Sequence, residues 1–222
     1  MRNQTPPAAG KAQAAAQPID PSASSAFTKS GPIAALGDRL AFLKGFIKDP
    51  NGTAALVPSS HWLEQRVVNN ARVRDAKCVI ELGPGTGGTT RALLRQMNPQ
   101  ARLLAIELNP EFAAHVKSVV GDPRLHVECG SAERLAEYLA ARRLPAPDAV
   151  ISGIPFSTMP QDVGDRIAAA LSRALVPGGR FVAYQWTPVV AERTIPYLGE
   201  PKREWEAFNI PPMRVFTWVK KG

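Results

Sequence analysis

The stretch Val79-Ile80-Glu81-Leu82-Gly83-Pro84-Gly85-Thr86-Gly87-Gly88 decides the fold of this chain. A short apolar run with one acid leads into glycines at alternate positions, and a helix is predicted directly afterwards, over residues 89–97. Glycine lacks a Cβ atom, so the backbone can turn sharply and a ligand can approach it closely. A strand, a glycine turn and a helix form the usual cofactor site of a doubly wound α/β fold.

The glycines alone fit two kinds of cofactor. Gly83, Gly85 and Gly88 satisfy the Gly-x-Gly-x-x-Gly pattern of dinucleotide-binding proteins. Glu107 follows at about the 20-residue distance at which that pattern places an acid. The position of Glu81 before the glycines, and the stiffening Pro84, instead favour S-adenosylmethionine. A structural turn that binds no ligand is the remaining alternative.

The pattern Glu-x-Gly-x-Gly-x-Gly over residues 81–87 resembles the class I S-adenosylmethionine-dependent methyltransferases. The resemblance implies that Gly83, Gly85 and Gly87 form the cofactor loop. It also implies that Glu81 acts near the methionine part of the cofactor and that Glu107 holds the ribose hydroxyls. A carboxylate suits both roles, because it accepts two hydrogen bonds and favours a cationic ligand.

The composition indicates one globular domain with a basic surface. The chain has 222 residues, a formal net charge of +8 and a sequence pI of about 9.9. Such a charge favours an anionic partner, which could be nucleic acid, acidic lipid or an acidic protein. Two cysteines, Cys78 and Cys129, lie in predicted strands, so buried free thiols and a reducing compartment are expected. With only three scattered histidines, a metal site is not expected.

The N-terminal part differs from the rest of the chain. Residues 1–30 are rich in Ala, Pro, Ser and Gln and lack the apolar core of a signal peptide, so they are predicted to be a disordered tail. The methyltransferase-like domain is assigned to residues 31–222. No apolar run approaches the roughly 20 residues that a membrane-spanning helix needs.

A first amphipathic helix is predicted over residues 33–48. Its apolar side chains recur every three or four residues, and Arg39, Lys44 and Lys48 edge the apolar stripe. Phe42 lies off that stripe. This pattern is typical of a helix that lies in a bilayer interface, although a helix that covers the cleft would look similar. A second helix is predicted to begin after Ser60, a suitable cap, and to end near residue 71.

From residue 77 onward, predicted strands alternate with predicted helices. The strands are expected at 78–82, 102–107, 124–128, 148–152 and 179–186, and the helices at 89–97, 110–119, 132–142 and 160–174. This alternation predicts an α/β fold with five parallel strands. Two further strands, 204–210 and 214–220, have so short a link that they must pair antiparallel. A closing antiparallel hairpin is typical of class I methyltransferases and disfavours a plain dinucleotide-binding domain.

A second chemical motif follows the fourth predicted strand, at Ser152-Gly153-Ile154-Pro155-Phe156. Ligands in open α/β sheets lie beyond the carboxyl ends of the strands, so this turn should lie near the glycine loop. Its backbone carbonyls could orient the N–H bonds of an amine, and Phe156 could offer a π face to a cationic product. An ordinary strand-to-helix turn is the alternative.

Gly-Ile-Pro-Phe is similar to the Asn-Leu-Pro-Tyr type motif of amino-group methyltransferases, including the ribosomal RNA adenine dimethyltransferases. Here Gly153 replaces the asparagine whose amide helps those enzymes to hold an adenine. Ser-Gly-Ile-Pro, together with residues 42–47 and 58–60, resembles instead the bacterial phospholipid N-methyltransferases. That resemblance runs from about residue 40 to the C-terminus and implies that Ser152 lies at the cofactor site and that Gly153 and Pro155 lie at the catalytic site.

One expected contact departs from the class I pattern. Many members carry an acid after the third strand that binds the adenine amino group, whereas this chain has Cys129-Gly130-Ser131-Ala132. Ser131 is the candidate acceptor in its place. It would accept the hydrogen bond more weakly than a carboxylate.

The implied reaction is methyl transfer from S-adenosylmethionine to a neutral amine. A lipid ammonium resembles lysine, whose reference pKa is about 10.4, so the amine must be deprotonated or desolvated first. Candidate bases are Tyr184, His61 and Glu192. Tyr184 could equally be a core aromatic, and His61 a surface residue next to a helix cap.

The resemblance therefore implies methylation of phosphatidylethanolamine toward phosphatidylcholine by a cytoplasmic enzyme bound peripherally to an anionic membrane at its inner face. Nucleic acid is a less favoured partner, because the asparagine and an added C-terminal RNA-binding domain are missing. The alternatives are a ribosomal RNA adenine N6-methyltransferase, a non-catalytic protein that binds S-adenosylmethionine or lipid, and an NAD-dependent dehydrogenase.

Overall fold

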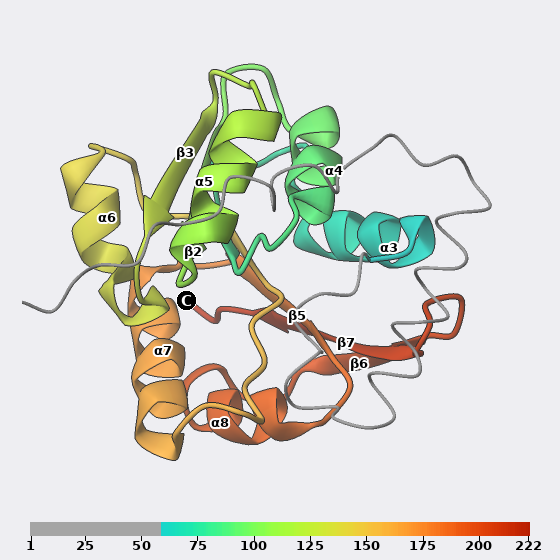
Figure 1. The fold of residues 1–222 in the computed structure, drawn as a ribbon. Coiled ribbons are helices and arrows are strands. Elements are labelled where there is room, and N and C mark those ends of the chain that lie inside the picture. Colours follow the sequence, from blue (N-terminus) through green and yellow to red (C-terminus); the bar gives the residue numbers. More distant parts are fainter. Residues whose placement is uncertain (1–58) are drawn as a thin grey trace, which may run out of the picture. The chain divides into compact units, whose positions relative to one another are not determined.

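The computed structural model describes residues 59–222. The expectations for the tail at 1–30 and for the amphipathic helix at 33–48 lie outside these residues. The described part is built on a seven-stranded sheet with the order β3-β2-β1-β4-β5-β7-β6 (Figure 1). The strands are β1 Cys78–Leu82, β2 Arg102–Glu107, β3 Leu125–Cys129, β4 Ala149–Ser152, β5 Arg180–Gln185, β6 Lys202–Glu206 and β7 Met213–Val219.

The pairing confirms the predicted architecture. Strands β1 to β5 are parallel to one another, whereas β7 is antiparallel to both β5 and β6. The central strands β1 and β4 are buried along their whole length, as the apolar runs of a doubly covered parallel sheet require. The order of the strands reverses beside β1, which is where such sheets bind their ligands.

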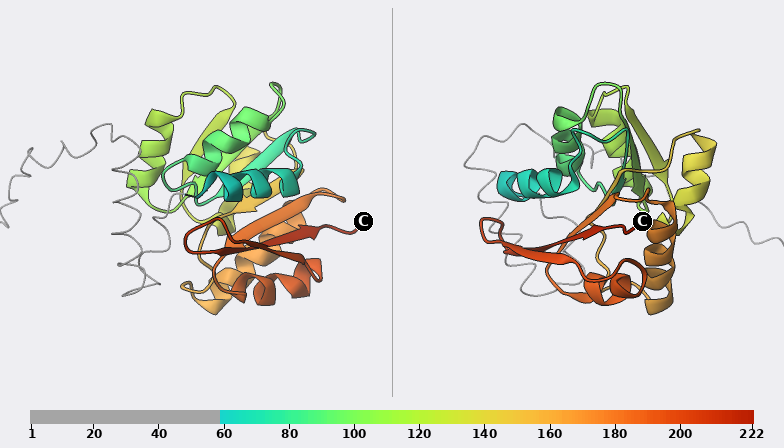
Figure 2. Two further views of the ribbon diagram at one scale, coloured as in Figure 1. Left: turned by 90° about the vertical axis from the view of Figure 1, so that its right-hand side faces the viewer. Right: turned by 180° about the vertical axis from the view of Figure 1, so that it is seen from behind.

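Helices cover both faces of the sheet (Figure 2). On one face, α3 His61–Ala71, α4 Gly88–Gln96 and α5 Pro110–Val119 pack on alternate strand residues such as Val79, Ile151 and Val182. The other face packs against the remaining helices, which are α6 Leu135–Ala141, α7 Gln161–Ala174 and α8 Val189–Leu198. A short 3-10 helix, η3 Ala132–Arg134, leads into α6.

The C-terminal region differs in detail from the sequence prediction. Helix α8 was not predicted, and its segment contains Pro188 and Pro196, residues that disfavour the interior of a helix. Pro188 is only the N-cap residue, and Pro196 lies near the end of the helix, so little of the hydrogen-bond ladder is lost. The predicted strand 204–210 was also wrong in its second half. Strand β6 ends at Glu206, and the chain then turns towards β7.

Helix α3 and the hairpin β6–β7 are joined by polar contacts. Ser60 caps α3 by accepting a hydrogen bond from the backbone N–H of Leu63. Arg66 forms ion pairs with Glu204 and Glu206, at 3.2 and 2.8 Å. The hairpin β6–β7 is thus fixed by ion pairs with α3 on one face, and on its other face β7 packs against the core.

The two cysteines have different surroundings. Cys78 is buried, as predicted, and burial raises the pKa of its thiol to about 12. Cys129, at the end of the edge strand β3, is exposed, so the prediction of a buried thiol there was wrong. An edge strand is covered on fewer sides than a central one, and the sequence alone did not reveal which strand lies at the edge.

Candidate active site

A cavity of about 1030 Å³ lies beyond the carboxyl ends of β1, β2, β3 and β4. Its walls come from the glycine loop, the start of α5, the β3–η3 turn, and the segment from Gly153 to the first half of α7. Of the predicted site residues, those that line it are Gly83, Gly85, Glu107, Ser131, Gly153 and Pro155. The fold therefore brings both sequence motifs to one hollow.

The glycine loop adopts the backbone conformation that its sequence predicts. Gly83, Gly85 and Gly87 have φ angles of 72°, 54° and 81°, a region that side chains with a Cβ atom rarely adopt. A Cβ on Gly83 would lie 2.7 Å from Cγ2 of Ile154. The loop is therefore packed against the turn after β4, and Gly87 lies outside the cavity as the N-cap of α4.

Glu107 ends β2 with its carboxylate directed at the loop. One oxygen accepts a hydrogen bond from the N–H of Gly85 at 3.2 Å, and the other accepts one from the N–H of Asn109 at 3.0 Å. The residue is only 8% exposed but lines the cavity. Two backbone donors thus fix the carboxylate, and its remaining lone pairs can accept hydrogen bonds from a ligand.

At the β3–η3 turn, Ser131 has an acidic neighbour that the sequence analysis missed. The Ser131 hydroxyl caps η3 and donates to Glu133, which also lines the cavity. Hydrogen bonding from Arg166 and then from Ser131 lowers the pKa of Glu133, so its carboxylate is ionised. The acid expected after the third strand is therefore present two residues later. A sequence signal for Glu133 was available, because a serine that can cap a helix, Ser131, is followed by an acid in the first helical turn.

The turn after β4 is packed against Tyr184 of β5. A Cβ on Gly153 would lie 2.5 Å from the Tyr184 hydroxyl oxygen, which also lies 3.3 Å from Oγ1 of Thr89. Burial raises the pKa of Tyr184 to about 12. The phenol therefore stays protonated at neutral pH, and its hydroxyl occupies the space into which a side chain at residue 153 would project.

Glu81 lies behind the glycine loop and is not among the residues that line the cavity. It is 1% exposed, and one carboxyl oxygen accepts a hydrogen bond from Thr90 Oγ1 at 2.7 Å. The other oxygen has no hydrogen-bond partner within the described part of the chain. Burial raises the pKa of Glu81 from 4.5 to about 8. A cationic ligand nearby would favour ionisation of this carboxyl.

Other candidates lie away from the cavity. Ser152 is fully buried on the opposite face of the sheet from Glu81, among the residues that pack on α6 to α8. His61 is exposed at the start of α3, and Glu192 is exposed on α8. Phe156 is completely buried in the core, so the prediction that its ring offers a π face to a cationic product was wrong. Of the three candidate bases, only Tyr184 contacts the turn that lines the cavity.

Several apolar residues of the cavity wall were not predicted. Leu108 is 73% exposed although it directly follows the buried Glu107. This apolar wall is completed by Phe112 of α5, Met159 of the loop before α7 and Ile167 of α7. The sequence carried no signal for these residues, because the exposure of Leu108 and the helix packing that brings in the others are visible only in the structure.

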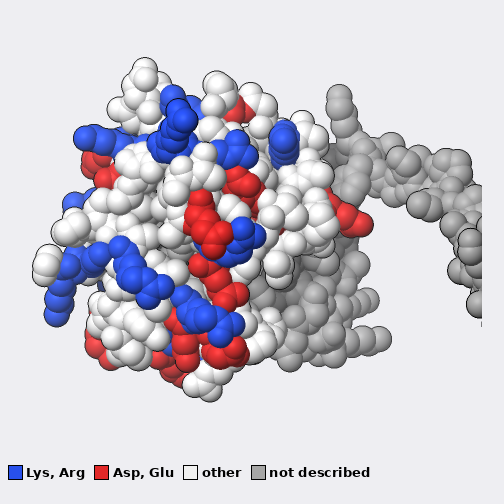
Figure 3. Space-filling model, turned by 90° about the vertical axis from the view of Figure 1, so that its left-hand side faces the viewer, with Lys and Arg blue, Asp and Glu red and all other residues white. Residues whose placement is uncertain are grey.

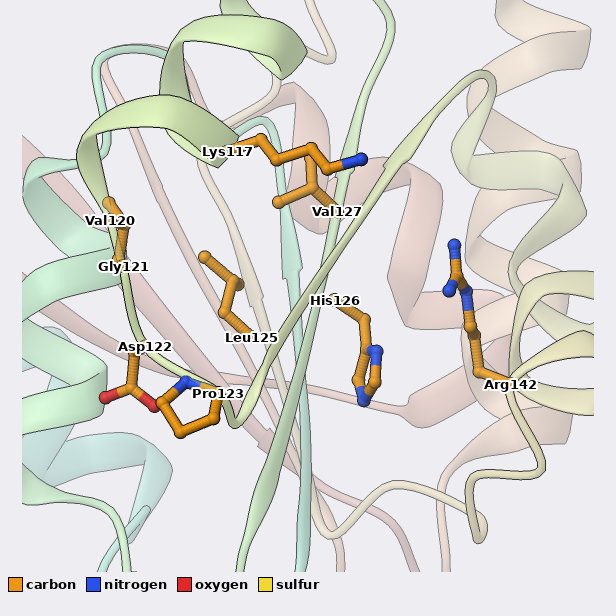
Figure 4. Close-up of a pocket in the computed structure, with 9 residues that line it drawn as sticks. All are labelled: Lys117, Val120, Gly121, Asp122, Pro123, Leu125, His126, Val127 and Arg142. Carbon is orange, nitrogen blue, oxygen red and sulfur yellow. The ribbon is translucent and has the colours of Figure 1, made fainter.

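A second hollow of about 400 Å³ lies at the start of β3, between the end of α5 and Arg142 (Figure 4). Arg142 is ion-paired with Glu128, and Asp122 with Arg124. Burial and the nearby Arg142 and Arg102 lower the pKa of His126, which remains neutral. Because this hollow lies at the amino ends of the strands, it is on the edge of the sheet opposite to the usual ligand site.

Residues 59–222 lack two further features. Within this range, no helix has the length and apolar character needed to cross a bilayer. The same residues contain no group of three His, Cys, Asp or Glu side chains placed to hold a metal ion.

Comparison with known proteins gives a consistent result. Residues 79–179 match a family described as a methyltransferase domain. The ornithine lipid N-methyltransferase of Singulisphaera acidiphila is 29% identical over 79% of this chain and 92% of that protein. The ribosomal RNA small subunit methyltransferase H of Hydrogenovibrio crunogenus is 30% identical over 50% of this chain, but only 37% of its own length is matched. The O-methyltransferase of Bacillus cereus, solved in complex with SAH, superposes with a TM-score of 0.60 and 14% identity over 81% of this chain and 91% of that one.

The residues of the cavity fit S-adenosylmethionine. Gly83 and Gly85 line the cavity with positive φ angles, and Glu107 presents a fixed carboxylate. Behind the loop, Glu81 keeps a buried oxygen that has no partner among the described residues. An oriented pair of acids beside a glycine turn suits a ligand with ribose hydroxyls and positive charge. The chain is therefore an S-adenosylmethionine-dependent methyltransferase with the class I fold.

Proposed function

We propose that the protein methylates the amino group of a lipid, and that its acceptor is phosphatidylethanolamine, which it converts toward phosphatidylcholine. The observation that carries the proposal is the turn at Gly153–Pro155, which lines the cavity and packs against Tyr184. The similarity to an ornithine lipid N-methyltransferase over nearly its whole length supports a lipid amine as the acceptor. The net charge of +8 favours an acidic lipid surface.

The turn offers a carbonyl to the acceptor. The carbonyl of Ile154 accepts a hydrogen bond from Gln185 at 2.6 Å, and that of Pro155 accepts one from Thr158. Within the described residues, the Gly153 carbonyl accepts none. This carbonyl can therefore accept a hydrogen bond from an N–H group of the amine and so direct the nitrogen lone pair towards the cofactor.

Tyr184 acts in this proposal as a second orienting group. Because its pKa is raised to about 12, it stays a neutral phenol rather than a base at neutral pH. It can donate to Thr89 and accept a hydrogen bond from the amine with its lone pairs. Desolvation of the amine beside this buried hydroxyl lowers the amine pKa and favours the neutral, nucleophilic form.

S-adenosylmethionine supplies an activated methyl group on a sulfonium centre. The chain's contribution is to hold the amine in line with that group, and positioning of this kind can account for several kcal/mol of the barrier. In this proposal, the apolar wall that includes Leu108 and Met159 packs against the bound molecules and lowers the access of water to the reacting atoms.

Two observations favour a lipid amine over an RNA adenine. The Tyr184 hydroxyl fills the space that an asparagine at residue 153 would need, so the amide typical of adenine-binding motifs is excluded sterically as well as by sequence. On the face that carries α6 and α7, basic and acidic side chains are interspersed rather than gathered by sign (Figure 3). Arg142 and Arg166, for example, are both ion-paired there.

The location that follows is the inner, cytoplasmic face of the membrane, with the protein bound peripherally. The amphipathic stripe predicted over residues 33–48, edged by Arg39, Lys44 and Lys48, is one candidate contact. That contact remains a prediction from the sequence.

The proposal is tested by offering the purified protein labelled S-adenosylmethionine with three acceptors in parallel: phosphatidylethanolamine vesicles, ornithine lipid vesicles and ribosomal RNA. We expect label in phosphatidylethanolamine, with Glu107→Ala as the inactive control. Label in ornithine lipid alone would correct the headgroup. Label in RNA alone would replace the proposal with an RNA methyltransferase.

A further inference from the structure

Exposed apolar side chains gather at one end of the hairpin β6–β7. The described residues include nine large hydrophobic side chains that are exposed, and five of them belong to this hairpin, to the start of α3 or to the end of β5. These five are Trp62, Trp186, Trp205, Phe208 and Ile210. Three of the four tryptophans of the chain are among them, whereas Trp218 lies in the core. Tryptophan is normally largely buried in a folded protein, so this distribution calls for a partner.

The tip of the hairpin is fixed rather than loose. The rings of Trp62 and Phe208 contact each other, with centroids 5.7 Å apart. Between Phe208 and Ile210, the buried Asn209 accepts a hydrogen bond from the N–H of Ser60 and donates one to the carbonyl of Pro211. This anchor turns Phe208 and Ile210 outward, where they are 74% and 63% exposed.

A cation lies beside Trp205, which is on the face of the hairpin away from α3, because its neighbours Glu204 and Glu206 face Arg66 of α3. The Arg214 guanidinium stacks over the ring of Trp205, 4.5 Å from its centroid, and donates a hydrogen bond to the carbonyl of Trp186. Among the ion pairs of residues 59–222, none includes Arg214. Its charge is therefore not neutralised by an acid of the described part of the chain.

The hairpin tip lies at the same edge of the sheet as the cofactor cavity. Gln185, at the carboxyl end of β5, pairs with Arg214, and Arg214 pairs with Trp205 at the end of β6. The turn that follows Trp205 and Glu206 is thus on the carboxyl edge, as are Gly83, Glu107 and Gly153. A surface that binds there would hold the cavity close to its own plane.

We propose that Trp62, Trp205, Phe208 and Ile210, with Arg214 beside them, form a membrane-docking surface, called here the aromatic hairpin surface. Tryptophan and arginine suit the bilayer interface, because the rings enter the headgroup region while the guanidinium pairs with lipid phosphate. This inference rests on the proposed function, since a lipid acceptor requires the cavity to approach a bilayer. It differs from the stripe at residues 33–48, because it lies on the folded domain itself.

The test measures binding of the full chain to vesicles of phosphatidylethanolamine and phosphatidylglycerol without methyl donor. Trp62→Ser with Phe208→Ser removes the contacting pair of rings from the surface. Tyr197→Ser with Val219→Ser is the matched control, because both residues are exposed but distant from the hairpin tip. Tyr197 lies near the end of α8, and Val219 pairs with Arg180 at the amino end of β5, which is the opposite edge of the sheet. We expect the first variant to bind about tenfold more weakly and the control to bind as wild type does.

Two further readouts separate this inference from the proposed function. Vesicles that contain brominated lipids should quench the tryptophan fluorescence of the wild type and of the control. They should quench the fluorescence of the first variant by a smaller fraction. All three proteins should transfer methyl groups equally to a short-chain phosphatidylethanolamine below its micelle concentration. If lipid is never methylated while vesicle binding still depends on the two rings, the proposed function fails and the docking surface stands.

The inference is overturned if the wild type does not bind these vesicles, or if the first variant binds them as tightly as the control. It is equally overturned if sedimentation shows that the wild type self-associates and that the variant does not. The aromatic hairpin surface would then be an interface with another protein chain.

Discussion

At the scale of single residues, the contact between Gly153 and Tyr184 decides which side chain can occupy residue 153, directly after β4. The hydroxyl oxygen of Tyr184 lies only 2.5 Å from the position that a Cβ atom at residue 153 would take. We expect Gly153→Ala to destabilise the fold by about 1–3 kcal/mol, as overpacking does. Tyr184→Phe removes the clashing oxygen, so the double variant should recover much of that loss.

A double-mutant cycle measured by urea unfolding checks this coupling. Each single variant, the double variant and the wild type are compared at one pH. Strictly additive costs would show that the two residues do not share the space, and the steric reason for a glycine at residue 153 would then be lost.

Glu107 is the residue on which cofactor binding should depend most. Its carboxylate accepts two backbone hydrogen bonds and faces the cavity. Glu107→Ala removes a charge-assisted acceptor, and one such hydrogen bond is typically worth about 1.5–3 kcal/mol, so S-adenosylmethionine affinity should fall by about 10- to 100-fold. Glu137→Ala, in an exposed ion pair on α6, is the control and should bind normally in calorimetry. Equal affinities for the two variants would remove Glu107 from the site.

Glu81 should make stability depend on pH. Its pKa is raised by burial to about 8 in the folded state, against 4.5 for an ordinary glutamate. Between these values the folded protein holds a proton that the unfolded chain has lost, so stability falls as pH rises. From pH 6 to pH 7.5 the loss from this group is on the order of 1–2 kcal/mol.

Glu81→Gln keeps an oxygen for Thr90 but cannot ionise. Its stability relative to the wild type should therefore increase as pH rises over that interval. Urea unfolding at pH 6 and pH 7.5 measures the difference, and a constant difference would mean that Glu81 is not held protonated.

Some of these residues could be assigned from the sequence, and others could not. The glycine loop and Glu107 are local features, because a positive φ and the residue at the end of a strand are set by nearby sequence. Tyr184 was only one of three candidate bases, since its contact with Gly153 joins strands that lie far apart in the chain. Glu133 was missed because it lies two residues beyond the expected position.

At the scale of elements, the hairpin tip is fixed to the start of α3 by one buried side chain. Asn209 is 3% exposed and joins the N–H of Ser60 to the carbonyl of Pro211. Asn209→Ala leaves both backbone groups without a partner, so we expect a loss of about 1–3 kcal/mol in the free energy of unfolding. Asn98→Ala, at an exposed turn, should cost less. Similar costs in thermal or urea unfolding would show that Asn209 is no anchor.

Alternating strands and helices were predicted well, because periodicity and glycine turns are strong local signals. The order of the strands was not predicted, but the final antiparallel hairpin followed from the sequence. Helix α8 did not, because proline is tolerated at its N-cap and near its end, where the sequence alone does not place the helix boundaries. The end of β6 was misplaced for a related reason, since the residues after Glu206 are aromatic and apolar although they form an exposed turn.

At the scale of the whole molecule, one edge of the sheet carries both the chemistry and the proposed membrane contact. The cofactor cavity, the turn at Gly153 and the aromatic hairpin surface all follow the carboxyl ends of strands. The excess of basic residues adds long-range attraction to an anionic surface, which salt would weaken. A lipid methyltransferase needs this combination, because it must bring a water-soluble donor to an acceptor anchored in a bilayer.

The most direct test of this account identifies the atom that is methylated. Purified wild-type protein and, in parallel, the Glu107→Ala variant are incubated with S-adenosylmethionine and vesicles that contain phosphatidylethanolamine. The lipids are then fragmented by tandem mass spectrometry to locate any added methyl group. We expect one or more methyl groups on the headgroup nitrogen with the wild type and none with the variant. Unmodified phosphatidylethanolamine from a wild-type protein that binds S-adenosylmethionine would contradict it.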